Sequence, residues 1–507
     1  MLNIDILLGI FECYRLDDEE NWNLQLGWCK LSHVCRKWRH LIHESFFHLN
    51  MYIPLTRGSR QLDLLTHLPP LPLVVDYHSG DAGEDHRAIL YAIQQRDRIF
   101  RIVFQAPSSI LHKLTMSMDE PFPRLETLSL LSMAKPEGGT ELILASTLLA
   151  PNLRHLSLRN LCLPTGLQLL TSALSLVTLD LTDIQAPGYL SPEHLVVHIR
   201  LMARLEELSV SFTIPVPRPR AEGELLRAPK TTVTLPSLKR FRFRGVAAYL
   251  ESLVARIRAP LLQRFSIILF NQLAFTLPRL SRFINAQEGL GYRHVSVKFD
   301  HEAVSIAIRH PMHLSDGVFD LAVRCNQFDW QVDSAGQVCG ALLPVLSDAE
   351  KLALYFYGPT LPSQWQGEVG STVWHDLLLP FNGVKKLWID TALSLELSSA
   401  LQPDEGLGSS SDRLLPELRE LESELEIGQA KNTFTPFLDA RRLAGHPVDL
   451  CTSQPVFIMP LSDTMTSLPE IRSEQIRKRI FTHSSLAENH RYNFQAPESD
   501  PSPYNEE

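Results

Sequence analysis

One short pattern recurs through most of the chain and restricts what it can fold into. It reads L-x-x-L-x-L, where L is leucine or another apolar residue, and two of its best copies are Leu125–Leu130 and Leu153–Leu158. Copies begin at residues 99, 125, 153, 176, 205, 238, 262, 292, 318, 349, 384 and 418, so neighbours start 23 to 35 residues apart. The last two apolar positions alternate with other residues, which is typical of a β-strand with one buried face.

A single unit of this size cannot bury the apolar face of its own strand, but stacked units can. The spacing is close to the period of roughly 20–29 residues that leucine-rich repeats show. We therefore expect an α/β fold, an irregular leucine-rich-repeat-like solenoid over residues 99–450 with a concave parallel sheet. Segments such as Ala247–Arg256 are predicted to return the chain as helices. The alternative is an ordinary α/β protein rich in Leu-x-Leu strands.

The segments outside the repeats differ in composition. Residues 56–98 are predicted to form a connector and the N-terminal cap of the solenoid, with a strand near 71–77 and a helix near 86–95. Pro215–Pro229 and Gln402–Asp412 are predicted to be polar loops between units. Residues 434–448 resemble a closing unit, and residues 451–507 are expected to form a partly disordered tail that ends in a Pro-rich, acidic stretch.

Composition and motifs exclude several classes of function. The formal net charge of -9 argues against a general nucleic-acid binder. Seven scattered cysteines without a Cys-x-x-Cys pair suggest neither a metal site nor a redox pair. No apolar run approaches 18 residues and no signal peptide is indicated, so we expect no membrane contact and a cytoplasmic or nuclear location. No catalytic or cofactor-binding motif is found, and we expect no enzyme activity and no cofactor.

The first fifty-odd residues contain a second kind of pattern. Residues 28–42 read as an amphipathic helix with one apolar face and one basic face, preceded by a shorter apolar run between Leu2 and Phe11. About 50 residues bury too little surface to be stable without help. This segment must therefore pack on the rest of the chain or offer an apolar face to a partner.

The order of residues in this segment resembles an F-box. Leu2–Phe11, a variable insert and then Leu31–Arg39, with its Val-Cys-Arg-x-Trp core, resemble the F-box of basidiomycete fungal proteins that carry degenerate leucine-rich repeats. One departure is Asn3, where the family usually has proline. The resemblance implies an all-α domain over residues 1–55 that binds the Skp adaptor. The residues expected to contribute to that contact, or to the small core beneath it, are Leu2, Ile6, Leu7, Ile10, Phe11, Leu31, Val34, Cys35, Trp38 and Leu41.

The resemblance also implies a function. Through the adaptor and a cullin scaffold, such a protein is the substrate-recognition subunit of an SCF-type E3 ubiquitin ligase and does no bond chemistry itself. Two alternatives remain open. The segment could merely cap a leucine-rich-repeat scaffold without a ligase role, or the chain could be an enzyme with a site in the hollow of the solenoid.

The side chains predicted on the concave face suggest where a partner protein binds. If the strands are placed correctly, the non-leucine positions of three successive copies share a basic patch, although the whole chain is acidic. We expect this patch to bind an acidic or phosphorylated substrate, because arginine holds carboxylate and phosphate groups bidentately. Its residues are Arg240, Arg242, Arg244, Arg264, His294 and Lys298. The simpler interpretation is a solvated strand face.

Overall fold

The computed structural model describes part of the chain, and the fold is given for that part. The described residues are 4–18, 27–44, 53–55, 72–78, 86–133, 148–163, 167–184, 190–213, 231–287, 293–309, 319–358, 361–362, 365, 367, 369–402 and 414–452. The predictions for Leu2, Asn3, the insert after residue 214, nearly all of the loop after residue 401 and the tail beyond residue 452 lie outside them.

The N-terminal segment contains three helices, α1 (Ile4–Asp18), α2 (Gly27–Val34) and α3 (Arg36–Glu44). The single helix that we predicted over residues 28–42 is wrong, because Cys35 separates α2 from α3. Cys35 begins α3 as a capping residue does: its sulfur accepts the backbone N–H of Trp38 at 3.4 Å, and its carbonyl accepts that of Arg39 at 3.0 Å. This interruption changes which apolar side chains share a face.

The rest of the described chain is built on one long sheet, which confirms the predicted α/β solenoid. Sixteen described strands join it in the order β1-β2-β3-β4-β5-β6-β7-β9-β11-β14-β13-β12-β15-β16-β17-β18. Each of the twelve predicted repeats contributes one strand. These twelve strands are β3 (Ile99–Ala106), β4 (Thr127–Ser132), β5 (His155–Arg159), β6 (Thr178–Ile184), β7 (Glu207–Phe212), β9 (Arg240–Gly245), β11 (Arg264–Phe270), β12 (His294–Phe299), β14 (Phe319–Arg324), β15 (Lys351–Phe356), β16 (Lys386–Ile389) and β17 (Glu420–Ser423).

Four further strands extend or interrupt this series. They are β1 (Ile53–Leu55), β2 (Leu73–His78), β13 (Ala303–Arg309) and β18 (Asp449–Thr452). A separate pair, β8 (Val233–Thr234) and β10 (Ile257–Arg258), forms a small parallel ladder of its own. The long sheet therefore begins with β1, at the end of residues 1–55 that the sequence assigns to the helical domain, and its last described strand ends at residue 452.

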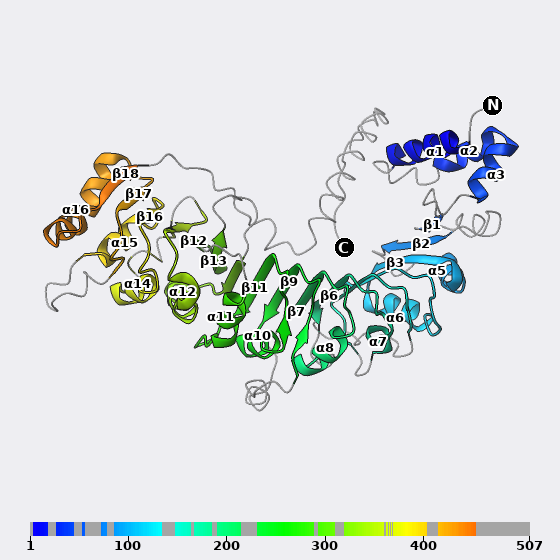
Figure 1. Cartoon of the computed structure of the whole chain (residues 1–507), viewed down its shortest axis with the longest axis horizontal. Helices are drawn as coiled ribbons and strands as arrows, with labels where there is room; N and C mark the ends of the chain where they lie inside the picture. The colour runs from blue at the N-terminus through cyan, green and yellow to red at the C-terminus, as the bar shows by residue number, and fades with distance from the viewer. Residues whose placement is uncertain are drawn as a thin grey trace, which may run out of the picture. The chain divides into compact units, whose positions relative to one another are not determined.

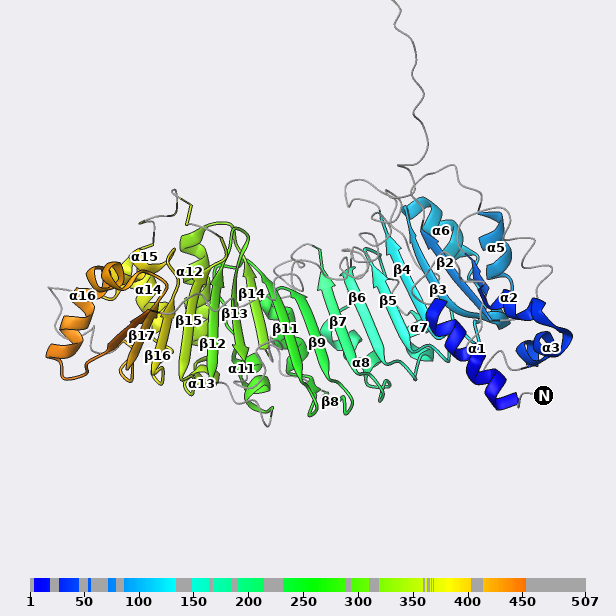
Figure 2. The ribbon, with the colours of Figure 1, turned by 90° about the horizontal axis from the view of Figure 1, so that it is seen from above.

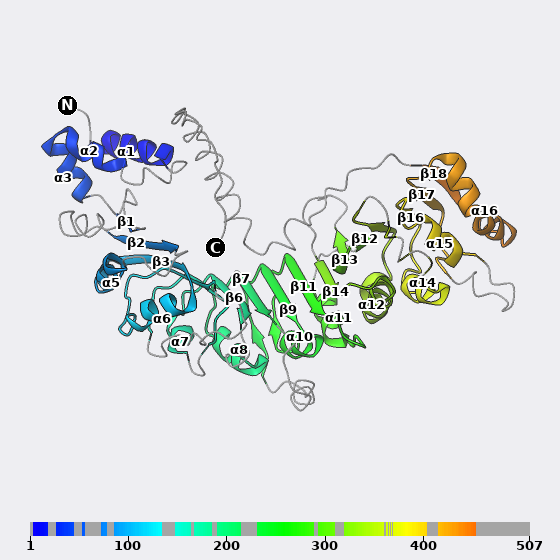
Figure 3. The same ribbon diagram turned by 180° about the vertical axis from the view of Figure 1, so that it is seen from behind.

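The helices between the strands lie along one face of the sheet, as Figure 1 and, from behind, Figure 3 show. They are α5 (Arg87–Ile93), η2 (Arg96–Arg98), α6 (Ser108–Met116), α7 (Gln168–Ser172), α8 (Pro192–Ile199), α10 (Ala247–Val254), α11 (Pro278–Asn285), α12 (Phe328–Ala341), α13 (Leu343–Leu346), α14 (Ser371–Leu378), α15 (Ser394–Ala400) and α16 (Ile427–Leu443). Alternate strand residues such as Leu156 and Leu158 are fully buried beneath them. We call the opposite side of the sheet, where the other alternate side chains point, the helix-free face.

One departure from the simple stacking order lies in the middle of the sheet. Strand β13 is antiparallel to both of its neighbours, β12 and β14, whereas all the other neighbouring strands are parallel. Asp300 reverses the chain before β13, because its Oδ1 accepts the backbone N–H groups of Glu302 and Ala303 at 2.9 and 2.8 Å. As a result β14, not β12, lies beside β11 (Figure 2).

Within the described residues, no helix combines the length and the apolar character that crossing a membrane requires.

Candidate binding surfaces

The apolar residues that the sequence assigns to the adaptor contact divide into a buried and an exposed group. Phe11 is fully buried, and its ring meets that of the half-buried Trp38 edge-on, with 4.9 Å between centroids. The other buried members of the segment are Leu7, Leu31, Leu41 and Ile42. These residues form the core of the three helices and belong to the same apolar cluster as buried residues of β2 such as Leu73.

The other described members of the predicted set point away from this core. Ile6, Ile10 and Val34 are 52%, 42% and 58% exposed, and Cys35 is also exposed. Helix α1 therefore carries two apolar stripes at i, i+4 spacing, Leu7 with Phe11 inward and Ile6 with Ile10 outward. A short helix that is apolar on its exposed side as well as its buried side is typical of an interaction surface.

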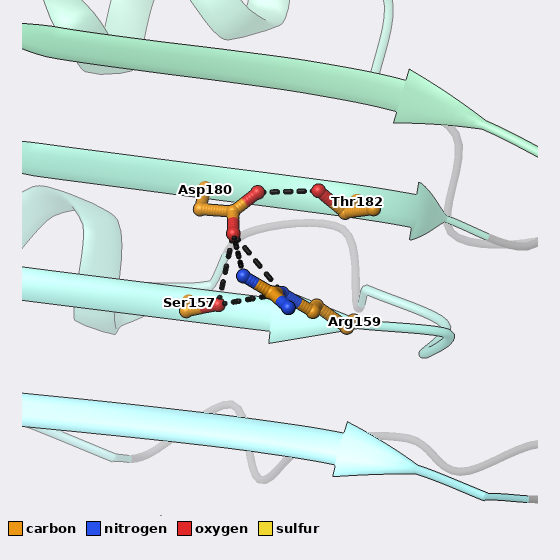
Figure 4. A network of polar contacts seen from close by, with 4 residues as sticks. All are labelled: Ser157, Arg159, Asp180 and Thr182. Atoms are coloured by element: carbon orange, nitrogen blue, oxygen red, sulfur yellow. Dashed lines mark hydrogen bonds and ion pairs between the residues drawn. The ribbon is translucent and has the colours of Figure 1, made fainter. Parts of the chain in front are cut away.

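The helix-free face of β5 and β6 is polar, and the charges of Arg159 and Asp180 neutralise each other there. On β5 and β6, the Asp180 carboxylate accepts hydrogen bonds from Ser157 at 3.1 Å, from Arg159 at 2.7 and 3.1 Å, and from Thr182 (Figure 4). Both members of the ion pair are largely buried, with side chains 24% and 14% exposed. This network links two neighbouring strands, and its two charges neutralise each other, so neither is available to a ligand.

The predicted basic patch is only partly assembled. Arg240, Arg242 and Arg244 lie on the helix-free face of β9, with Arg264 opposite Arg240 on β11. Arg240 forms an ion pair with Glu207, and Arg244 forms a longer one with Asp183 at 3.4 Å. Arg242 is exposed, and no described residue forms a hydrogen bond or an ion pair with it. Charge on this strand is therefore most available at Arg242.

The other two predicted residues lie elsewhere. The sequence placed His294 and Lys298 on the strand next to β11, and this is wrong, because β14 and β13 lie between β11 and β12. Lys298 pairs with Asp300 at 3.3 Å, and its ammonium lies 5.2 Å from the centroid of the Tyr357 ring. The antiparallel return through β13 is the physical reason for this displacement.

The strands that intervene bring charged residues that the sequence analysis missed. Arg309 on β13 and Arg324 on β14 are added to the face, together with Asp320 on β14. Burial raises the pKa of Asp320 to about 6, although the charges of Arg309 and Lys298 act in the opposite direction. The alternation Ala303-Val304-Ser305-Ile306-Ala307-Ile308 after the turn at Asp300 was the signal that could have revealed this hairpin.

Tyr355 and Trp388 form an aromatic pair on the same face. Tyr355 lies opposite Lys298, and its ring contacts that of Trp388 edge-on at 6.1 Å between centroids. Burial raises the pKa of Tyr355, whereas Arg309 and a hydrogen bond with Ser296 lower it. Beyond this pair, Lys386 is neutralised by Glu420 and Glu422. No three described His, Cys, Asp or Glu side chains form a group that could hold a metal ion.

Comparison with known proteins does not assign the chain to a family. No protein-family model matches the sequence, and no curated protein does. One matching solved structure is the leucine-rich repeat-containing protein LegL7 from Legionella pneumophila, with 11% sequence identity and a TM-score of 0.23. The match covers 76% of this chain and 97% of that chain. With so low a TM-score, the assignment rests on the chain's own sheet order and register: the fold is an irregular leucine-rich-repeat-like α/β solenoid.

Proposed function

We propose that this chain is the substrate-recognition subunit of an SCF-type E3 ubiquitin ligase. The N-terminal helices would bind the Skp adaptor, which links the chain to a cullin scaffold, and the helix-free face would hold a protein substrate. The chain itself would be non-catalytic and would act by proximity, raising the concentration of substrate near the transfer machinery. It would work in the cytoplasm or the nucleus, where such ligases operate.

The observation that carries this proposal is the division of the apolar residues in α1–α3. Leu7, Phe11 and Leu31 are buried within the segment, so they are not available to a partner. Ile6, Ile10 and Val34 are exposed, and burying three such side chains in an interface would stabilise a complex by several kcal/mol at ~25 cal/mol per Å² of apolar surface. The same order of residues carries the resemblance to an F-box.

A pull-down with purified Skp adaptor tests the proposal. The wild-type chain should form a complex, and the double variant Ile6→Asp, Val34→Asp should lose it, because both substitutions place a charge in the interface. Val197→Asp is the matched control, since Val197 is similarly exposed, at 47%, but lies on α8 of the solenoid. Circular dichroism of all three chains should show unchanged helix content.

A second outcome distinguishes the main alternative. If the wild-type chain forms no complex with the adaptor, the helical segment is a structural cap, and the chain is a protein-binding scaffold without a ligase role. Trp38→Ala is a poor probe for this purpose, because Trp38 packs against the buried Phe11 and its loss would disturb the segment itself.

A further inference from the structure

One row of positions crosses six strands of the helix-free face and carries mostly small side chains. We call it the central row, and the register aligns its positions strand by strand. They are Ser266 on β11, Asp320 on β14, Ala307 on β13, Ser296 on β12, Ala353 on β15 and Trp388 on β16. Longer side chains border the row, with Arg309 and Lys351 on one side and Lys298 and Tyr355 on the other. Between its acidic and its aromatic end, the row offers only alanine and serine to a segment lying along it.

The carboxyl of Asp320 in this row has no partner among the described residues. Burial raises its pKa to about 6, yet no described residue donates a hydrogen bond to it or forms an ion pair with it. Asp320 is still partly exposed, so a ligand can reach it. At pH 7.5, above this pKa, the carboxyl is mostly ionised. A largely buried carboxylate without hydrogen bonds is costly unless a donor group satisfies it.

Arg309 provides the complementary group. It lies two residues beyond Ala307, the position opposite Asp320, so Arg309 and Asp320 are diagonal neighbours roughly 7–8 Å apart. Burial outweighs it, but the positive charge of Arg309 acts on Asp320, although no ion pair joins them. The Nε of Arg309 is buried without a hydrogen-bond partner, and its terminal amino groups, which are not enclosed, form no hydrogen bond with a described residue. One unsatisfied donor group and one unsatisfied acceptor group thus lie side by side on the face.

The charges in the middle of the central row are nearly balanced. Arg309 and Asp320 carry opposite charges, and the neighbouring cation Lys298 is neutralised by Asp300 at 3.3 Å. The exposed cations around the row are Arg242, Arg264, Arg324 and Lys351. Because water and salt screen exposed charges, these cations contribute little between Arg309 and Asp320. A neutral polar group therefore fits between Arg309 and Asp320 better than an ion does.

We propose that the central row binds an extended segment of the partner protein, in which the side-chain carboxamide of an asparagine or glutamine lies between Arg309 and Asp320. A carboxamide is neutral and offers an oxygen to the guanidinium and an NH2 group to the carboxylate, so it satisfies both at once. A carboxylate would satisfy Arg309 but be repelled by Asp320, and an ammonium group would do the reverse. The inference rests on the proposed function, since the segment belongs to the protein that the ligase holds.

Trp388 supplies an apolar contact at the other end of the row. Its ring meets that of Tyr355 edge-on, and the position beside it on β15 is Ala353, whose methyl group covers little of the indole. Four strand spacings separate Trp388 from Asp320, or roughly 19 Å at ~4.8 Å each. An extended chain covers this distance in roughly six residues. The segment is therefore expected to carry an apolar side chain at about that spacing from its carboxamide.

A protein segment fits this row better than a strand of nucleic acid does. A nucleic-acid backbone needs a continuous stripe of unpaired cations. Two of the lysines that border the row are already neutralised, Lys298 by Asp300 and Lys386 by Glu420 and Glu422. The row therefore lacks the continuous positive charge that successive phosphates require.

Binding of short peptide libraries to the full-length chain at pH 7.5 tests the proposal. Each library carries a fixed leucine and one test residue roughly six residues to either side of it, with alanine, serine and glycine randomised elsewhere. The test residue is asparagine or glutamine in the carboxamide libraries, and glutamate, lysine or leucine in the other three. The carboxamide libraries should bind at least tenfold more tightly than the others, because only they satisfy both Arg309 and Asp320.

Two variants should change this preference in opposite directions. Arg309→Gln leaves the carboxylate of Asp320 without an opposing charge, so the lysine library should become the preferred one. Asp320→Asn leaves the guanidinium of Arg309, so the glutamate library should become the preferred one. A merely structural role of either residue would instead weaken the binding of all libraries alike.

Two further variants complete the test. Arg324→Gln is the control, since it removes an exposed charge from the same strand as Asp320 and should leave the carboxamide preference unchanged. Trp388→Ala should weaken the binding of every library about tenfold, because all carry the leucine, and should leave the preference for a carboxamide in place.

Several results would overturn the proposal. They are equal binding of all libraries, no binding of any, an unchanged preference in Arg309→Gln and Asp320→Asn, and full affinity in Trp388→Ala. Displacement of the peptides by a single-stranded oligonucleotide at equal concentration would overturn it as well. The Skp pull-down is measured separately, so a carboxamide preference without adaptor binding would reject the ligase role alone.

Discussion

The rings of Phe11 and Trp38 pack edge to face with 4.9 Å between their centroids, and this contact joins α1 to α3. Phe11 is fully buried, whereas Trp38 keeps part of its ring in solvent. The contact is one of the interactions that hold the buried side of the helical segment together. It also separates the role of these residues from that of the exposed ones on the same helices.

Phe11→Ala should therefore loosen α1–α3 without disturbing the sheet. Removing a buried phenyl ring costs roughly 3–5 kcal/mol in a well-packed core, which exceeds what so small a core can sustain. Hydrogen exchange of the full-length chain should show loss of protection in peptides from residues 4–18 and 27–44 only. Ile10→Ala, on the exposed stripe of α1, is the control and should leave exchange unchanged. Loss of protection across the repeats as well would contradict this division.

The arrangement of the repeats could be predicted from sequence because each strand carries its own local signal. All twelve copies of the pattern contain a strand, and the alternation of buried and exposed positions follows from the period of two. The order of strands in the sheet carries no such local signal. Asp300 directs the chain back through β13, and this single turn decides that β14 rather than β12 lies beside β11.

The helical segment shows the same limit at a smaller scale. The apolar spacing of residues 28–42 fits one continuous helix, and that prediction was wrong because Cys35 caps a new helix. The interruption turns Val34 and Cys35 outward while Leu41 remains inside. A periodic pattern thus identified the apolar residues of the segment, but it could not separate those in the core from those at the surface.

The network at Asp180 predicts a strong coupling between two strands. Asp180→Ala would leave the largely buried Arg159 without its carboxylate, and we expect a loss of about 2–3 kcal/mol in the free energy of unfolding. The double variant Arg159→Ala, Asp180→Ala should lose clearly less than the sum of the two single variants. The same cycle on Lys239 and Glu206, a pair about 40% exposed at 2.9 Å, should give a coupling of roughly 0.2–1 kcal/mol. If urea unfolding gives the same coupling free energy for both pairs, burial of the Arg159–Asp180 pair does not strengthen its interaction.

Close backbone packing between neighbouring units predicts opposite effects for two glycines. A Cβ atom on Gly383 would lie 2.6 Å from the carbonyl oxygen of Ser347, in the loop before the adjacent strand β15. Because that oxygen belongs to the backbone, Gly383→Ala should lower the free energy of unfolding by about 1–3 kcal/mol. Gly340, in helix α12, has no atom within 4 Å of its Cβ position, and Gly340→Ala should raise stability by about 0.5–1 kcal/mol. Melting temperatures that shift in the same direction for both variants would refute the comparison.

Asp320 gives the solenoid a pH dependence with a defined sign. Burial raises its pKa from the ordinary 3.8 to about 6 in the folded chain, so the folded state favours the protonated carboxyl. The protonated Asp320 carboxyl contributes fully to the free energy of unfolding below pH 3.8. This contribution is lost as the pH rises through 6, because the unfolded chain then binds fewer protons than the folded one. At pH 7.5 the free energy of unfolding of Asp320→Asn, measured in urea, should therefore exceed that of the wild type by about 1–2 kcal/mol. Near pH 4 the two chains should have the same free energy of unfolding.

A second buried carboxyl contributes to the pH dependence of both chains. Burial also raises the pKa of Asp390 to about 6, and because Asp390 is present in both chains, the difference in stability between them reports on Asp320 alone. Asp348→Asn, at an exposed position outside the sheet, should show the same difference from the wild type at both pH values. A gap between Asp320→Asn and the wild type that does not change from pH 4 to pH 7.5 would mean that the charges of Arg309 and Lys298 fully offset the burial.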